Sequence, residues 1–231
     1  MAGRTAIIIG ATGGIGSALA DQLDATAHFD QVVRFSRHSN PAVDLLDEAS
    51  IKGAAQSLAD SGICPDLVIV ATGLLHLAGR GPEKSLRDLD PEWLLLNYRV
   101  NAIGPALVAK HFLPLMPKDR RVCFAALSAR VGSISDNRLG GWHSYRASKA
   151  ALNMLIRNLA VEWQRKNPNS VIVGLHPGTV DSALSSPFKG NPAHERFTAP
   201  KAAMQLLTVL ETINADQSGQ LFAYDGTIIA P

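Results

Sequence analysis

The stretch TAIIIGATGGIG, residues 5–16, decides the fold of this chain. Its isoleucine run is typical of a buried strand, and it stops at Gly10, where a turn begins. Gly14 and Gly16 follow and open the segment IGSALADQL, which has helical periodicity. A strand, a glycine-rich turn and a helix in this order predict a dinucleotide site, because glycines let the backbone approach a pyrophosphate and free helix amides stabilise its charge. A purely structural turn is the alternative.

The same alternation of apolar runs and helical segments continues along the chain, as in strand–helix–strand units stacked into a parallel sheet. The expected strands cover residues 4–10, 31–36, 66–71, 120–128, 170–176 and 220–225. The expected helices cover residues 15–23, 48–62, 91–113, 144–166 and 200–213. The sequence has no internal repeat or linker. It therefore predicts one α/β domain over residues 1–231, with a doubly wound parallel sheet, helices on both faces and ligands at the carboxyl ends of the strands.

The composition is that of a folded protein, with 46% hydrophobic and 18% charged residues among 231. The net charge is +2 and basic residues are scattered, so we expect neither a nucleic acid nor a membrane as partner. Cys64 and Cys123 lie in apolar stretches and are expected to be core residues, which favours a reducing compartment. The first apolar run reaches its glycines too soon for a signal peptide, so we expect a cytoplasmic protein. The dispersed histidines predict no metal site.

The end of the second expected strand, RFSRHS, indicates which dinucleotide binds. An NAD-specific site would place an acidic residue here for the ribose 2′-hydroxyl. Ser36 and Arg37 stand here instead, and a hydroxyl and a guanidinium suit a 2′-phosphate, so we expect NADP rather than NAD. Asp44, with its neighbour Leu45, would face the adenine. The alternatives are a solvated arginine and an aspartate that only closes a turn.

The stretch HSYRASKAAL carries a pair of side chains with a chemical use. Tyr145 and Lys149 are four residues apart, so on a helix they lie on one face. A free phenol has a pKa of about 10, and an adjacent ammonium lowers it, which makes the tyrosine a usable general acid or base. Arg146 and Ser148 point elsewhere on the helix, and we expect neither to take part in the chemistry.

Two further polar residues belong to the expected site. Ser128 ends a strand at the same sheet edge and could donate a hydrogen bond to a substrate carbonyl. Asn101 is a poor helix former in the middle of the apolar stretch YRVNAIGP, as though its amide were needed. Each of the four has a plain alternative: a surface pair, a strand-end serine, or an asparagine satisfied by backbone. It is their combination behind a nucleotide loop that indicates an active site.

With these residues the chain resembles the short-chain dehydrogenase/reductase family over nearly its whole length. This resemblance implies a Rossmann-type fold. The stretch from Ser128 to Asn153, with its long segment before the tyrosine, is similar to the subgroup of C-factor-like proteins and sniffer-type carbonyl reductases. The four motifs that carry the resemblance are Gly10 to Gly16, VATG with Ala71, Thr72 and Gly73, YRASK, and HPGTVDS with Pro177, Gly178, Val180 and Ser182. Ala71 and Thr72 depart from the asparagines that are usual in this family.

The resemblance implies a role for each site residue. Tyr145 is the proton donor or acceptor, and Lys149 lowers its pKa and holds the nicotinamide ribose. Ser128 orients the carbonyl, which requires a loop to bulge between it and Tyr145, 17 positions further along the chain. Asn101 anchors a water relay. The residues expected to contact the cofactor are Gly10, Thr12, Gly14, Ile15, Gly16, Ser36, Arg37, Asp44, Leu45, Ala71, Thr72, Gly73, Tyr145, Lys149, Pro177, Gly178, Val180 and Ser182.

The expected reaction is reversible hydride transfer between NADP and a small carbonyl or alcohol substrate. A signalling or nucleotide-binding protein on the same fold, without turnover, is the alternative. Residues 181–199 are expected to form a lid, or else an ordinary surface loop, and Trp142 and His143 to line its mouth. The apolar helix face around Leu155 would serve a homodimer or homotetramer, although burial in the core explains it as well.

Overall fold

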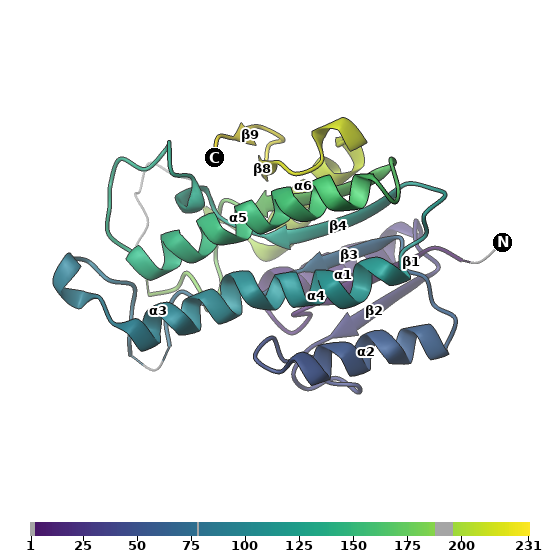
Figure 1. Ribbon diagram of the computed structural model, residues 1–231, viewed down its shortest axis with the longest axis horizontal. Helices are drawn as coiled ribbons and strands as arrows, with labels where there is room; N and C mark the ends of the chain where they lie inside the picture. The colour runs from purple at the N-terminus through teal and green to yellow at the C-terminus, as the bar shows by residue number, and fades with distance from the viewer. Residues whose placement is uncertain (1–2, 78, 188–195) are drawn as a thin grey trace.

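The computed structural model describes residues 3–77, 79–187 and 196–231. At its centre lies a seven-stranded sheet (Figure 1). Its strands run in the order β2-β1-β3-β4-β5-β8-β9. All neighbours are parallel except the last pair. The strand bounds are β2 (Gln31–Phe35), β1 (Thr5–Ile9), β3 (Leu67–Val70), β4 (Val122–Leu127), β5 (Ser170–His176), β8 (Leu221–Ala223) and β9 (Ile228–Ile229).

The predicted doubly wound fold is confirmed by the position of β1. Its successor β2 lies on one side and β3 on the other, so the strand order reverses at β1. Such a reversal opens a crevice outside the carboxyl ends of the strands, because the connections leave in opposite directions. The glycine loop after β1 lies in this crevice.

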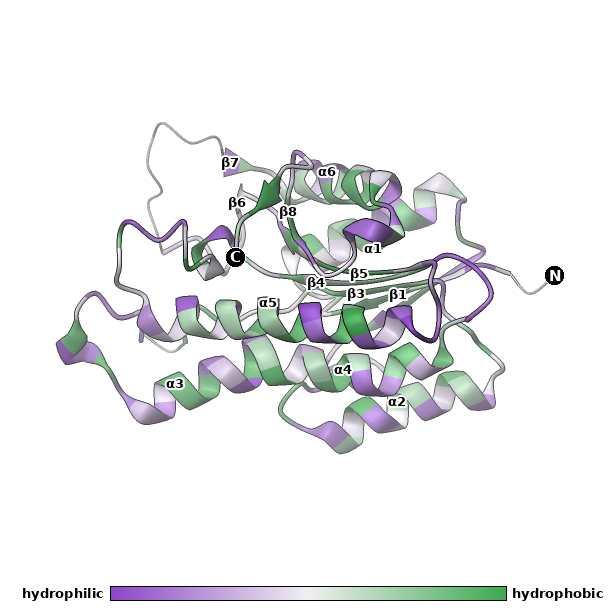
Figure 2. Ribbon diagram, turned by 45° about the horizontal axis from the view of Figure 1, so that its top comes forward, coloured by the Kyte–Doolittle hydropathy of each residue, from purple (hydrophilic) through white to green (hydrophobic). Residues whose placement is uncertain are grey.

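Helices cover both faces of the sheet (Figure 2). On one face lie α1 (Gly14–Thr26) and α6 (Ala199–Thr212), and on the other α2 (Glu48–Asp60), α4 (Gly104–Phe112) and α5 (His143–Gln164). Strands β1, β3 and β4 are buried along their whole length, which explains why they have uninterrupted apolar sequences rather than alternating ones. On α5, Leu152 and Ile156 belong to the core under the sheet. Burial therefore accounts for much of that helix face without a partner subunit.

The helix expected over residues 91–113 contains a local change of geometry. It runs as α3 (Pro91–Tyr98), a π-helical turn (Arg99–Ile103) and α4. Pro105, in the first turn of α4, has no amide hydrogen for a regular bond one turn back, and a widened turn accommodates this. Asn101 lies within the π-helical turn, a feature that is frequent at functional sites.

Several details differ from expectation. Strand β9 and the short pair β6 (Thr179–Val180) and β7 (Arg196–Phe197) were not expected, because two-residue strands leave no periodic pattern. Cys123 is buried as predicted, but the prediction for Cys64 is wrong: it is exposed, because β3 begins only at Leu67 and Cys64 lies in the preceding loop. No helix of the described ranges is both long and apolar enough to cross a membrane.

Candidate active site

Two adjoining cavities lie at the carboxyl edge of the sheet. The catalytic cavity, of about 440 Å³, is lined by Ser128, Tyr145 and Lys149. The β2-side cavity, of about 380 Å³, extends from the glycine loop to Ser36 and Leu45. The two form one cleft because they share wall residues, namely Gly13, Arg37, Ala71, Thr72 and Gly73.

The glycine loop is packed so tightly that larger residues do not fit. A Cβ atom on Gly16 would lie 2.2 Å from the carbonyl oxygen of Gly10. Gly10 has a φ of +88° and would place a Cβ 2.7 Å from Cγ2 of Thr72. Helix α1 then begins after Gly13, with no side-chain cap and no acidic residue in its first turn. Its amide groups and positive dipole end therefore remain available for an anion in the cleft.

The β2 end of the cleft contains the residues expected to select the nucleotide. Arg37 is exposed and lines both cavities, whereas Ser36 is buried and its hydroxyl accepts a hydrogen bond from the amide of His38. Asp44 lines the β2-side cavity, but its Oδ1 accepts from the amide of Leu46, as in a turn. The hydroxyl oxygen of Thr72 is buried without a hydrogen-bond partner among the described residues. A buried, unpaired hydroxyl beside the glycine loop suits a polar ligand group.

Tyr145 and Lys149 lie on successive turns of α5 and are both buried. The Lys149 ammonium nitrogen donates a 2.7 Å bond to the carbonyl of Leu127 and lies 5.8 Å from the centroid of the Tyr145 ring. Burial raises the pKa of Tyr145 to about 12 and lowers the pKa of Lys149 to about 7. The shift of the phenol pKa is opposite to the expected direction. Burial disfavours both charged forms, and a lysine that is partly neutral at pH 7 stabilises a phenolate weakly.

The lowered pKa of Lys149 predicts how the stability of the protein depends on pH. Between its folded pKa of about 7 and the ordinary value of 10.5, the unfolded chain binds a proton that the folded chain has released. The free energy of unfolding therefore rises with pH in this window, by up to about 1.4 kcal/mol per pH unit. Tyr145 acts with the opposite sign and only above pH 10, because its folded pKa is raised to about 12.

Urea unfolding of the wild type and of Lys149→Met checks this expectation. From about pH 7.5 to about pH 9.5 the wild type should gain up to about 2 kcal/mol relative to the variant, which has no group to titrate there. A constant difference in the free energy of unfolding between the two proteins across this pH range would contradict the lowered pKa of Lys149.

Ser128 lies in the catalytic cavity with Tyr145, as predicted. Residues 129–142 form the expected bulge, which packs so closely on α5 that a Cβ on Gly132 would lie 2.8 Å from the carbonyl carbon of Lys149. Arg146 fixes this loop by donating to carbonyls within it, and it does not line the cleft. The Ser128 hydroxyl donates a 2.7 Å bond to Oδ1 of Asn153.

Asn101 lies behind the cleft and not in it. Its side chain is fully buried, with Oδ1 accepting from the amide of Leu74 and Nδ2 donating to the carbonyl of Leu74, both at 2.8 Å. It thereby fixes the loop after β3. Nδ2 also donates a 3.1 Å bond to the hydroxyl of Ser148, which is buried and does not line the cleft.

The HPGTVDS motif divides between the cleft and the core. Pro177 and Ser182 line the catalytic cavity. Gly178 has a φ of +74°, and a Cβ there would lie 2.7 Å from the ring of Phe197. Val180 is buried in the same cluster as Phe197, so packing beneath the cleft explains both the absence of a side chain at Gly178 and the burial of Val180.

The structure brings most of the expected residues together. Those on the cleft walls are Gly10, Thr12, Gly14, Ile15, Ser36, Arg37, Asp44, Leu45, Ala71, Thr72, Gly73, Ser128, Tyr145, Lys149, Pro177 and Ser182. Those expected in the site but absent from its walls are Gly16, Asn101, Gly178 and Val180. Of the expected lid, residues 188–195 lie outside the described residues.

Two residues near the cleft were not predicted from the sequence. His76 lines the catalytic cavity, and its Nε2 lies 2.9 Å from the carbonyl of Ala183, so it connects the loop after β3 to the start of the expected lid. Glu83 is buried, and its carboxylate accepts from the amide and the hydroxyl of Ser144, which fixes the turn that carries Tyr145. A histidine soon after a strand end was a usable signal. Glu83, in the polar loop RGPEKS, gave none.

The sequence matches a known protein family over most of its length. Residues 4–192 match the model described as short chain dehydrogenase. The chain belongs to the short-chain dehydrogenase family. This short-chain dehydrogenase is also 30% identical over 234 residues to a Rhodococcus protein named 1-hydroxy-2-glutathionyl-2-methyl-3-butene dehydrogenase, covering 97% of this chain and 98% of that one. The predicted enzyme class, an oxidoreductase of this family, is therefore confirmed.

Two further comparisons bear on the subgroup. The short-chain dehydrogenase is 33% identical over 143 residues to C-signal from Myxococcus xanthus, covering 62% of this chain and 81% of that one. Its fold matches the NADPH-bound carbonyl reductase from chicken fatty liver with a TM-score of 0.85 and 24% identity, covering 99% of this chain and 94% of that one. The first agrees with the predicted C-factor-like resemblance, and the second agrees with the fold.

Proposed function

We propose that this chain is an NADP(H)-dependent oxidoreductase that transfers hydride between the nicotinamide and a small carbonyl or alcohol, with Tyr145 as general acid and base. The observation that carries the proposal is the shared cavity of Ser128, Tyr145 and Lys149, which opens directly onto the glycine loop. The fold does not need a buried proton donor beside a nucleotide-binding loop for its stability. Carbonyl reduction needs both the proton donor and the bound nucleotide.

The residues of the cleft fit a dinucleotide. Gly10 and Gly16 have no side chains, so the pyrophosphate could approach the backbone and the amides of α1 closely. The Thr72 hydroxyl, which has no hydrogen-bond partner among the described residues, offers a polar contact beside them. Arg37, at the end of β2, would hold the 2′-phosphate. When bound, the cofactor supplies or accepts the hydride. The NADPH-bound carbonyl reductase of similar fold supports the choice of NADP.

Tyr145 is suited to give a proton to a carbonyl oxygen. With a pKa raised to about 12 it is protonated at neutral pH, so it can donate its proton to a carbonyl oxygen in the catalytic cavity that it lines. Lys149, with a pKa lowered to about 7, is partly charged at the same pH. It can therefore favour the phenolate as that form develops, and it holds the strand end through Leu127.

The substrate class follows from the same proton transfer. Tyr145 would give a proton to a carbonyl in one direction and take a proton from an alcohol in the other. The names of two similar proteins contain the two kinds of group: one is a dehydrogenase of a hydroxy compound, and the other is a carbonyl reductase. The test is a fluorescence titration with NADPH followed by turnover with a panel of small aldehydes, ketones and alcohols. Turnover supports the proposal.

A binding or signalling protein without turnover is the second candidate, favoured by the similarity to C-signal. The same experiment separates the two candidates. Tight NADPH binding with no turnover of any carbonyl or alcohol would favour this second function over catalysis.

Arg37 gives a specific prediction for the choice of nucleotide. Removing its guanidinium in Arg37→Leu should weaken NADPH binding about 10- to 50-fold and leave NADH binding within about threefold, because only NADPH has the 2′-phosphate. Arg34→Leu, at an exposed position on β2 where the arginine pairs with Asp21 and Asp24, is the matched control and should change neither. Titration of both nucleotides measures this. Equal weakening of NADPH and NADH by Arg37→Leu would contradict the assigned contact.

A further inference from the structure

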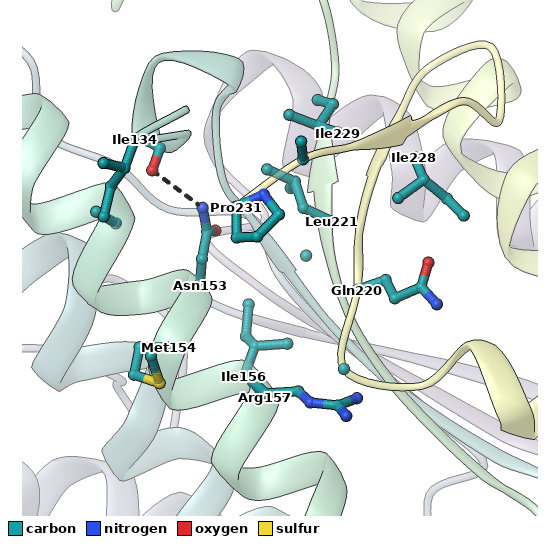
Figure 3. A pocket seen from close by; sticks show the side chains of 15 residues that line it. Ile134, Asn153, Met154, Ile156, Arg157, Gln220, Leu221, Ile228, Ile229 and Pro231 are labelled. Atoms are coloured by element: carbon teal, nitrogen blue, oxygen red, sulfur yellow. Dashed lines mark hydrogen bonds between the residues drawn. The ribbon is translucent and has the colours of Figure 1, made fainter. Parts of the chain in front are cut away.

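A third cavity lies between α5 and the C-terminal segment that contains β8 and β9 (Figure 3). Its volume of about 540 Å³ is within the range of small-molecule sites, about 300–1,000 Å³. None of the residues that line it also lines the two cavities of the cleft. It is therefore separate from the candidate active site, and we call it the rear cavity.

The wall of the rear cavity is mostly apolar and partly open to solvent. Ile156 and Leu221 form part of its buried side. Ile134, Met154 and Ile228 also line it, and they are 78%, 62% and 55% exposed. Exposed side chains of this size leave apolar surface in contact with water, and a ligand with an apolar body would cover that surface. The wall therefore favours an apolar ligand over a polar one.

Arg157 is the only charged side chain among the described residues that line the rear cavity. Its Nη1 donates a 3.3 Å bond to the carbonyl of Ser218, and it forms no ion pair with any carboxylate of the described ranges. A guanidinium has five N–H donors in a planar fork that matches a carboxylate. Most of the Arg157 donors are therefore available to an anionic group at the cavity.

The charged and apolar parts of the cavity are arranged along its length. Figure 3 shows Arg157 at one end and Pro231 at the other, with Ile156 between them. Pro231 is held at its end by Ser135, whose amide and hydroxyl donate to its carbonyl oxygen at 3.1 and 2.6 Å. A ligand with its anionic end at Arg157 would lay its apolar part along Ile156 toward the opposite end.

We propose that the rear cavity binds a medium-chain carboxylate, with the carboxylate on Arg157 and the hydrocarbon chain along the apolar wall. One cation matches one anionic group, and no acidic side chain stands among the described wall residues to repel it. The site goes beyond the proposed hydride transfer and does not depend on it, so it is tested without nucleotide.

The methionines provide the reporters for the test. The chain has four of them, of which Met154 lines the rear cavity, Met116 is buried in the core and Met204 is exposed on α6. In NMR spectra of protein with isotope-labelled methionine methyl groups, Met154→Leu identifies the Met154 signal. Octanoate should shift this signal saturably, with a Kd of about 1 mM or below, and leave the signals of Met116 and Met204 in place.

The contact with Arg157 is tested by comparing octanoate with octanamide, which has the same chain and no charge. Arg157→Gln keeps an amide donor for Ser218, and it should weaken octanoate binding about fivefold while octanamide binding changes by less than about twofold. Arg157→Lys keeps the charge and should stay within about threefold of the wild type. Arg165→Gln, at an exposed position beside the end of α5 and away from the cavity, is the matched control and should change neither.

Four outcomes contradict the proposal. The first is a Met154 signal without saturable shift up to about 20 mM octanoate. The second is an equal shift of Met204, which indicates adsorption to exposed apolar side chains. The third is a Met154 signal that responds to protein concentration and not to octanoate, which indicates that a second copy of the chain covers the cavity. The fourth is equal weakening of octanoate and octanamide by Arg157→Gln. None of them affects the proposed reaction, which is measured separately with NADPH.

Discussion

Tyr145→Phe is expected to abolish turnover, with a loss of at least about 1000-fold in kcat, while NADPH binding stays within about twofold of the wild type. The substitution removes one oxygen from a buried ring, so the α5 packing persists and only the exchangeable proton is lost. Steady-state oxidation of NADPH with each active carbonyl measures kcat, and fluorescence titration measures binding.

The matched control is Tyr98→Phe, which removes the same oxygen from the last residue of α3, away from the cleft walls. It should leave kcat within about twofold of the wild type. If Tyr145→Phe keeps more than about a tenth of the wild-type kcat with every active substrate, Tyr145 is not the general acid.

Gly16→Ala is expected to have the second large effect, a loss of NADPH affinity of at least about 100-fold with a destabilisation of about 2–3 kcal/mol. The added Cβ would lie 2.2 Å from the carbonyl oxygen of Gly10, a backbone atom that cannot rotate away. Strand β1 and helix α1 must therefore separate at the turn where the pyrophosphate would bind. Urea unfolding and NADPH titration measure the two effects.

Gly53→Ala is the control for this substitution. A Cβ at that position in α2 meets no atom within 4 Å, so the change should raise the free energy of unfolding by up to about 1 kcal/mol and leave NADPH binding unaffected. Unaltered NADPH affinity in Gly16→Ala would contradict the close approach of this loop to the cofactor.

The order of elements was predictable because each buried strand has an uninterrupted apolar sequence. Strands β1, β3 and β4 have no solvated face, so period-2 alternation is absent and the runs stand out between helical segments. The glycine loop was predictable for a related reason. The close packing at Gly10 and Gly16 excludes other residues, so the constraint is visible in the sequence itself.

The partners of the active-site residues were not predictable. The contacts of Ser128 with Asn153 and of Asn101 with Leu74 join residues 25 and 27 positions apart, and no local pattern encodes them. The direction of the Tyr145 pKa shift was missed for the same reason. The spacing to Lys149 was visible, but the burial of both groups depends on the packing of the whole cleft.

The most direct test of the central claim is isotope transfer. The wild type is incubated with an active aldehyde or ketone and NADPH in which both hydrogens at C4 of the nicotinamide are deuterium, and the product is analysed by mass spectrometry. We predict an alcohol that carries one deuterium on the former carbonyl carbon, and none with Tyr145→Phe. Tight NADPH binding by the wild type without labelled alcohol from any carbonyl of the panel would contradict the account.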